Sequence, residues 1–246
     1  MNKYFNVNFE FNRSRFEKII EQTANYGKGY CCFIDLNSLV YSYKDKEYRN
    51  VLNNSLLNSC DGSYIAMSAS KIHNSSLKEY IGPDFFKKFI YINNKHLIIG
   101  NTEEAFRKIK LKVEKRITHP INLNYLSVPF LSVDEFDYFE ISENINKLNP
   151  DYIWISLGAP KQEYFMNKLL PHLNRGVMLG VGAAINYFSG EIKDIPQWAK
   201  KLHLIWAYRL FTEPKKQFKR LRSILLIFPK MIKEEKRRVE TSFNAL

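Results

Sequence analysis

Apolar and polar residues alternate in blocks between positions 152 and 182, and these blocks predict a strand, a helix and a second strand. The apolar run Tyr152 to Leu157 predicts the first strand, and the turn Gly158-Ala159-Pro160 ends it. A helix is expected to open at Lys161, and Gly176 to Gly182 predicts the second strand. Two apolar strands joined by a helix form one crossover unit of a parallel sheet. Because both strands end in glycine-containing turns, where α/β sheets bind their ligands, we expect a ligand site at this edge.

The rest of the chain repeats this alternation. Strand patterns cover residues 5–9, 31–36 and 96–100, and helical spacing covers 12–22, about 39–57, 103–116, 139–149 and about 197–211. Residues 58–63 and 117–138 are expected to be loops. Gly82-Pro83-Asp84 is expected to open a helix, because proline is favoured in the first turn. The order of elements predicts an α/β fold: a Rossmann-like, largely parallel sheet with flanking helices.

Residues 214–238 predict a basic amphipathic helix at the C-terminus. Apolar residues recur there at three- and four-residue steps, with Lys219, Arg220 and Arg222 between them. We therefore expect a core over 1–213 and an appendage over 214–246. Two interpretations of the helix stay open. The concentrated charge favours contact with an anionic membrane surface, and the alternative is a basic helix packed on the domain or on another subunit.

Composition indicates a folded chain whose positive charge is concentrated at one end. Hydrophobic residues make up 45% of the 246 residues and aromatic residues 15%, which excludes a disordered chain. The net charge is +12, and ten Lys/Arg against three Glu from Lys215 onward supply +7 of it. The anionic partner is therefore expected to meet the tail specifically.

Cysteine usage and the apolar runs bear on the compartment. The three cysteines include the adjacent pair Cys31-Cys32, which argues against a disulfide framework and for a reducing compartment. The N-terminus lacks the apolar core of a signal peptide, and Ile224 to Phe228 is too short to span a bilayer. The pattern predicts a cytoplasmic protein with at most peripheral membrane contact. Cys and His are too few and too dispersed to suggest a zinc site, and no metal or other cofactor is expected.

Three local patterns are candidates for ligand contact, and each has a simpler structural interpretation. Gly100-Asn101-Thr102 before a helix could hold a phosphate or be an ordinary connection between strand and helix. Asp61-Gly62 is a strong turn signal that also exposes a carboxylate. Gln162-Glu163 could contact a ligand or only cap the helix start.

Several kinds of chemistry lack their sequence motifs. The chain has no GxxxxGK[ST], HExxH, GxSxG or glycine-rich dinucleotide fingerprint. It also has no Asp-x-Asp, so a phosphate-bearing donor would need Arg, Lys and helix N-termini to stabilise the departing charge. Nucleic-acid binding fits the basic charge, but no recognition motif is present.

A resemblance to a known family rests on five motifs in order. LGAPKQE is followed by GVGAAINYFSG, IPQW, W-x-x-RL and EPKK. Together they resemble the WecG/TagA/CpsF glycosyltransferase family (glycosyltransferase family 26), over nearly the whole chain to about residue 222. The combination of the first two motifs is specific, whereas each alone would not be.

The resemblance implies an inverting, metal-independent hexosyltransferase. Such an enzyme moves an N-acetylmannosamine-type sugar from a UDP donor to polyprenol-diphosphate-linked N-acetylglucosamine, in teichoic acid, capsule or enterobacterial-antigen-like synthesis at the inner face of the cell membrane. The family's loop aspartate corresponds to Asp61, which is expected to be the catalytic base. An inverting transfer needs one carboxylate to take the acceptor's hydroxyl proton while the diphosphate leaves.

The resemblance also implies a set of substrate-binding residues. Asn37 would orient the sugar or the base, Gln162 would bond to donor or acceptor, and arginines would face the diphosphate. The full expected set is Asn37, Gly62, Gly100, Gly158, Pro160, Gln162, Glu163, Gly182, Asn186, Arg209, Arg220 and Arg222. A homo-oligomer is left open.

The chain departs from the family pattern around the expected sugar site. Asn186 replaces a usual Asp, and an amide cannot act as a base. Asp194, Ile205 and Asp35 also stand where other residues are usual. These departures favour an alternative, a degenerate non-catalytic protein that binds a nucleotide sugar or a lipid diphosphate.

Overall fold

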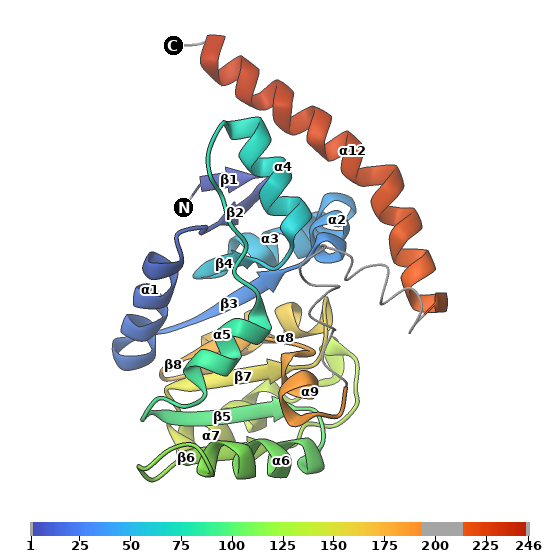
Figure 1. Ribbon diagram of the computed structural model, residues 1–246. Coiled ribbons are helices and arrows are strands. Elements are labelled where there is room, and N and C mark those ends of the chain that lie inside the picture. Colours follow the sequence, from blue (N-terminus) through green and yellow to red (C-terminus); the bar gives the residue numbers. More distant parts are fainter. Residues whose placement is uncertain (1, 193–213, 245–246) are drawn as a thin grey trace.

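The core of the protein is a six-stranded parallel sheet. The computed structural model describes residues 2–192 and 214–244. Strands lie in the order β4-β3-β8-β7-β5-β6, and every neighbouring pair is parallel (Figure 1). The strands are β3 (Lys28–Ile34), β4 (Leu57–Cys60), β5 (Lys95–Gly100), β6 (Asn122–Leu126), β7 (Tyr152–Ser156) and β8 (Gly176–Gly180). The predicted Rossmann-like α/β fold is confirmed.

Helices cover both faces of the sheet and bury two separate cores. The first face carries α1 (Arg13–Tyr26), α5 (Gly82–Phe89), α6 (Glu103–Glu114) and α9 (Ala184–Ser189). The second carries α3 (Lys46–Asn53), α7 (Tyr138–Leu148) and α8 (Lys161–Leu169). Successive residues of β3 divide between them, because side chains on a strand alternate in direction: Cys31 belongs to the first core and Cys32 to the second.

The first core is largely aromatic and is centred on Trp154 in β7. Its ring meets Phe86 edge to face at 4.9 Å, and its indole Nε1 donates to His96 Nδ1 at 3.2 Å. Burial lowers the pKa of His96 to about 4, which keeps the ring neutral and able to accept this bond. Phe85 and Phe89 of α5 stack at 4.2 Å beside them.

A second group of elements lies beyond the β4 edge of the sheet. A hairpin of β1 (Asn2–Tyr4) and β2 (Val7–Phe9) joins α2 (Leu36–Lys44) and α4 (Ser63–His73) in the second core. The C-terminal helix α12 (Pro214–Asn244) packs on α2 and α4 (Figure 1). Phe228 and Met231 of α12 are buried there, and the Phe228 ring lies 5.8 Å from that of Phe5.

The structure corrects the predicted loop over residues 58–63. Leu57–Cys60 is the fully buried edge strand β4, and its polar residues satisfy their hydrogen bonds on backbone atoms. Asn58 Nδ2 donates to the carbonyl oxygens of Asn8 and Leu52, and Ser59 Oγ donates to that of Tyr80 at 2.6 Å. Polar side chains that bond to backbone can be buried at little cost, and a hydropathy pattern does not register them.

Three other boundaries differ from the predictions. The helix expected over about 39–57 is two helices, α2 and α3, separated by Asp45, which caps the second by accepting from Tyr48 N. Residues 122–126 in a predicted loop form the edge strand β6, and the turn after β8 continues into the short helix α9. The helix predicted over about 197–211 lies outside the described residues.

Candidate functional site

The turns that follow the parallel strands bring most of the expected site residues to one edge of the sheet. All six strands run in the same direction, so their carboxyl ends share this edge. Asp61 and Gly62 follow β4, Asn37 follows β3, and Gly182 and Asn186 follow β8. Gly158 to Glu163 follow β7, and Gly100 ends β5. Segments far apart in sequence thereby form one candidate site.

Asp61 stands between the end of β4 and the start of α5. Its backbone N–H donates to the carbonyl oxygen of Ile34 at 2.9 Å, which ties the turn to β3. Its carboxylate Oδ2 accepts from Gly82 N, the first residue of α5, at 3.4 Å. The side chain is half-buried. Asp61 is therefore a partly exposed carboxylate on a short, anchored turn, and not part of a long loop.

Asn37 lies in the first turn of α2, directly after β3. The preceding Asp35 caps this helix, because its Oδ1 accepts from Ser38 N at 2.7 Å. Asp35 therefore has a structural role as the N-cap of α2. Asn37 is half-buried at the same edge as Asp61.

The turn from β7 into α8 is open on its outer side. Gly158 has φ +76, and a side chain added there would meet no atom within 4 Å. A cis peptide bond joins Ala159 to Pro160, and α8 follows. Ser156 Oγ, at the end of β7, donates to the carbonyl oxygen of Gly182 at 2.8 Å. This bond joins the β7 turn to the β8 turn.

Gln162 and Glu163 are buried side chains in the first turn of α8. They are 4% and 2% exposed, and α8 has no side-chain capping bond. Gln162 Nε2 donates to Gly180 O at 3.0 Å and to Glu163 Oε1 at 2.9 Å. Burial raises the pKa of Glu163 to about 7, against the opposing effect of the bond from Gln162. The pair is therefore buried and internally bonded, and its contact with a ligand stays a prediction.

The segment after β8 is held by hydrogen bonds to the ends of β7 and β5. Gly182 has φ +50, which favours glycine, and its N–H donates to Ile155 O at 3.2 Å. Asn186, in α9, accepts from Asn101 Nδ2, which follows β5. The amide that replaces the family's usual carboxylate is thus a bonded part of this turn.

Gly100 is explained by packing. Its φ is +83, and a Cβ there would lie 2.9 Å from Ser156 O on the adjacent strand. Thr102 caps the following helix by accepting from Ala105 N at 3.1 Å. Thr102 is therefore the N-cap of α6, and phosphate contact at this turn stays a prediction.

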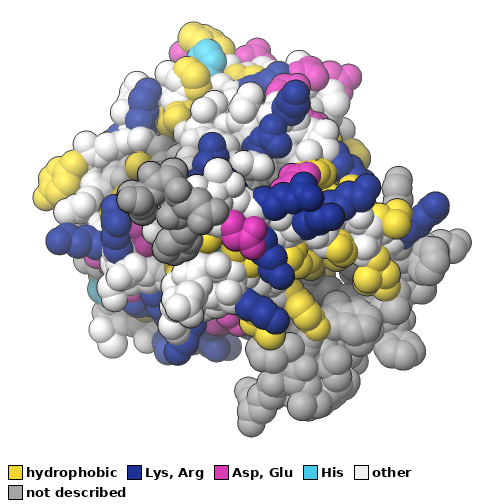
Figure 2. All heavy atoms as spheres, turned by 90° about the horizontal axis from the view of Figure 1, so that it is seen from above, with side chains coloured by type: hydrophobic (Ala, Val, Ile, Leu, Met, Phe, Trp, Pro, Cys, Tyr) yellow, Lys and Arg dark blue, Asp and Glu magenta, His cyan; other side chains and the backbone are white. Residues whose placement is uncertain are grey.

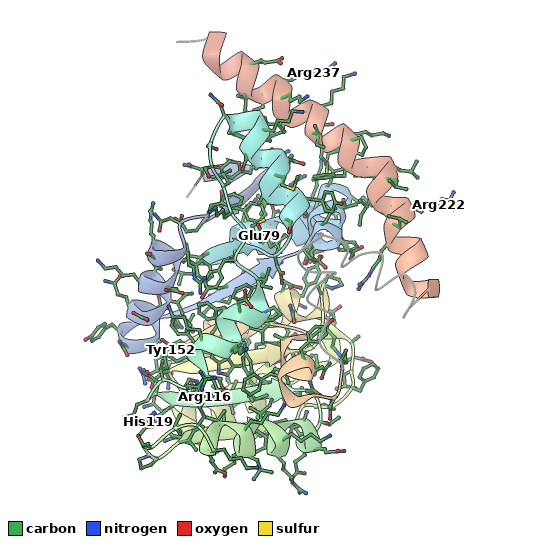
Figure 3. All side chains as sticks on the ribbon, in the orientation of Figure 1. Glu79, Arg116, His119, Tyr152, Arg222 and Arg237 are labelled. Atoms are coloured by element: carbon green, nitrogen blue, oxygen red, sulfur yellow. The ribbon has the colours of Figure 1, made fainter. Side chains whose placement is uncertain are left out.

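The predicted cationic residues lie either outside the described residues or on α12. Arg209, together with Asp194 and Ile205, lies outside the described residues. Arg222 is exposed, and its side chain points outward from α12 (Figure 3). Among the described residues, neither Arg220 nor Arg222 forms a hydrogen bond or ion pair with the strand turns, and their contact with a diphosphate stays a prediction. Within residues 2–192 and 214–244, no group of three or more His, Cys, Asp or Glu side chains is placed to hold a metal ion.

Helix α12 presents two different faces. Glu235, 3% exposed, anchors its inner face, because it accepts from Phe5 N at 3.0 Å and lies 2.9 Å from His73 Nε2. Its outer side exposes Leu225 and Leu226, at 65% and 60%. Figure 2 looks down on the molecule from above Figure 1, where α12 lies, and shows Lys and Arg side chains interspersed with hydrophobic ones. No helix in the described part of the chain is long and apolar enough to cross a bilayer.

Sequence reasoning missed three contacts that support the turns. Tyr48 is a neighbour of Glu163, Asn101 donates to Asn186, and Ser156 donates to Gly182. Asn101 and Ser156 stand at strand ends, which was an available signal. Tyr48 had none, because its position at the site depends on how α3 packs on α8.

Comparison with known proteins agrees with this geometry. The sequence model of the Glycosyl transferase WecG/TagA/CpsF family matches residues 4–241. A relative from Bacillus subtilis (strain 168), the N-acetylglucosaminyldiphosphoundecaprenol N-acetyl-beta-D-mannosaminyltransferase, is 28% identical over 197 residues, which cover 78% of this chain and 75% of the relative. A protein of the same name from Staphylococcus aureus (strain NCTC 8325 / PS 47) is 23% identical over 204 residues, 80% of this chain and 77% of the relative.

A third relative matches a shorter segment. The protein of that name from Bacillus spizizenii (strain ATCC 23059 / NRRL B-14472 / W23) is 33% identical over 100 residues, 41% of this chain and 38% of the relative. The family match, in contrast, covers the sheet, the strand-end turns and most of α12. This chain therefore belongs to the WecG/TagA/CpsF family of glycosyl transferases.

Proposed function

We propose that the protein transfers an N-acetylmannosamine-type sugar from a UDP donor to a polyprenol-diphosphate-linked N-acetylglucosamine, with inversion and without a metal ion. The observation that carries the proposal is the convergence of Asp61, Asn37 and the Gly158–Glu163 and Gly182–Asn186 turns at one edge of the sheet, in a chain that the family covers from residue 4 to 241. The names of the relatives supply the acceptor and the sugar class.

Asp61 is the base in this proposal. A general base must be within reach of the substrate and held in place, and the half-buried carboxylate of Asp61, which accepts from Gly82 N at the start of α5, supports this role. It would take the proton of the acceptor hydroxyl as that oxygen attacks the anomeric carbon and UDP departs. Asn186 cannot replace it, because a carboxamide does not accept a proton at neutral pH.

The deciding experiment is a transfer assay with the full chain. UDP-sugars, including UDP-N-acetylmannosamine, are offered with a short-chain polyprenol-diphosphate-N-acetylglucosamine, with and without EDTA. We expect EDTA-insensitive transfer that falls by a factor of about 100 or more in Asp61→Asn, within the usual range for loss of a general base. Asp84→Asn, an exposed acid in the first turn of α5, is the matched control. Near-normal transfer by Asp61→Asn would remove the base assignment.

The same assay separates the alternative function. A degenerate protein, suggested by Asn186, would bind the donor or lipid diphosphate and release no UDP. Turnover of the donor by purified protein rules that out. Binding without turnover, across the whole panel of sugars, would instead establish it.

The proposal places the protein on the cytoplasmic side of the membrane through α12. Leu225 and Leu226 supply exposed apolar area, and the cations of 214–238 supply attraction to anionic lipid. Deleting α12 would uncover Phe228 and Met231, so the point variant Leu225→Asp/Leu226→Asp is the cleaner test. We expect it to lose co-sedimentation with anionic liposomes at unchanged thermal stability. Binding equal to the wild type would contradict this orientation.

A further inference from the structure

A cluster of unpaired polar atoms lies beneath the β7 and β8 turns. Within the described part of the chain, the buried side-chain nitrogen and oxygen atoms without a hydrogen-bond partner are Tyr48 OH, Gln162 Oε1 and Glu163 Oε2. All three belong to one group of neighbouring side chains, since Tyr48 and Gln162 both lower the pKa of the Glu163 carboxyl. Buried polar atoms without partners are costly, so their concentration beside a candidate site calls for a functional reason.

The hydrogen bonds fix which way the Gln162 carboxamide points. Its nitrogen Nε2 uses both hydrogens, one on Gly180 O and one on Glu163 Oε1. In the inverted orientation the amide oxygen would face these same two acceptors, which is repulsive. The oxygen therefore stays on the other side, where a Cβ built on Gly182 would lie 3.4 Å from it. Gln162 thus ties the end of β8 to α8 and presents its oxygen to the β8 turn.

We propose that Glu163 is a positioning residue of the transfer site, which in its ionised form holds the Gln162 carboxamide and, through it, the β8 turn in the arrangement that binds the donor. This rests on the proposed function. The ionised form is an acceptor only, so it bonds to the amide nitrogen and excludes the inverted amide. A protonated carboxyl is a weaker acceptor and carries a proton that can itself seek the free Gln162 oxygen.

The surroundings of Glu163 make its hydrogen bond with Gln162 sensitive to pH. Its neighbours are Tyr48 of α3, Tyr30 and Cys32 of β3, and Asp35 at the cap of α2. Of these only Asp35 is expected to carry charge at neutral pH, and it is negative. The described residues give Glu163 no ion-pair partner, and burial raises its pKa to about 7. The carboxyl therefore changes its charge within the working range of a cytoplasmic enzyme.

The test compares Glu163→Gln and Glu163→Leu with the wild type between pH 6 and 8.5. At pH 8 we expect kcat/KM to fall at least about tenfold in Glu163→Leu and about threefold or less in Glu163→Gln, which can present an oxygen to Gln162. The kcat/KM of the wild type should fall below about pH 7, and that of Glu163→Gln should not. Glu10→Gln removes another buried acid, directly after β2, and should keep the fall in kcat/KM below about pH 7.

A second readout does not depend on transfer. The side-chain amide signals of Gln162 in ¹⁵N NMR, assigned by their loss in Gln162→Leu, should shift with pH about a midpoint near 7 in the wild type and stay constant in Glu163→Gln. If the wild type transfers no sugar, the proposed function fails. The NMR titration still tests whether the charge of Glu163 controls the Gln162 carboxamide. The inference is overturned if the kcat/KM of Glu163→Gln still falls below about pH 7, or if its Gln162 amide signals still shift with pH. Wild-type kcat/KM in folded Glu163→Leu would overturn it as well.

Discussion

The buried carboxyl of Glu163 should lower the stability of the fold as pH rises, and Glu163→Gln should remove that dependence. The unfolded carboxyl has its ordinary pKa of 4.5, and the folded one has a pKa of about 7. Between these values the folded protein keeps a proton that the unfolded chain releases. The free energy of unfolding therefore falls from pH 4.5 to pH 7 and stays at the lower value above pH 7.

The size of the effect follows from the same two values. The shift from 4.5 to about 7 corresponds to about 3 kcal/mol, because each pKa unit is worth about 1.4 kcal/mol. The Glu163 side chain is 2% exposed, so solvent screens this cost little. Glutamine has nearly the same shape and no charge, so the variant should gain about 3 kcal/mol relative to the wild type across this window.

Chemical denaturation at closely spaced pH values measures this difference. Urea unfolding curves of both proteins, recorded from pH 4.5 to 8, should diverge steadily up to about pH 7 and run parallel above it. Glu143→Gln, which removes an exposed acid on α7, controls for the change in net charge and should show no divergence. Wild-type and Glu163→Gln curves that stay parallel over the whole range would refute a buried, proton-retaining carboxyl.

Three further predictions concern packing. Gly176→Ala should cost about 2 kcal/mol or more in unfolding free energy, because a Cβ there would lie 2.6 Å from Pro150 O at φ +96, whereas Gly190→Ala, which faces only the flexible end of Lys112, should cost about 1 kcal/mol. Glu235→Ala should cost about 2 kcal/mol and increase proteolysis of α12, because it leaves the buried Phe5 N–H unpaired; equal stability would contradict the anchor. Tyr48→Phe should be neutral or up to about 1 kcal/mol more stable by calorimetry, and a clear loss would show that the hydroxyl is bonded after all.

The sequence by itself determined the class of fold and the place of the site. The apolar strand at 152–157 and the glycine turns that follow strand patterns sufficed, because a parallel strand buried on both faces leaves an unbroken apolar run. Their shared direction places every following turn at one edge. That reasoning found the positions of Gly158 and Gly182, and the structure places both at that edge. Asp61 was expected only from the family resemblance, because the strand before it, β4, was predicted to be a loop.

Polar residues inside the core were beyond the reach of the pattern. Asn58 and Ser59 are 0% exposed in β4. Their burial depends on backbone carbonyl groups of segments that are far away in the sequence and come close only in the folded protein. Hydropathy assigns such residues to loops, because it records the cost of leaving water and not the partner that offsets it. The edge strand β6 was missed for a related reason, since only one of its residues, Leu123, is buried.

The roles of individual side chains were decided by tertiary structure alone. Gln162-Glu163 reads equally well as an exposed cap or a buried pair, and the packing of α3 and β8 against α8 selects burial. The same packing raises the pKa of Glu163, since a pKa shift depends on desolvation and neighbours that no local pattern contains. Helix α12 shows the same division: its amphipathic sequence predicts a helix with an apolar face, and only the fold shows that Phe228 and Met231 meet the core while Leu225 and Leu226 face outward.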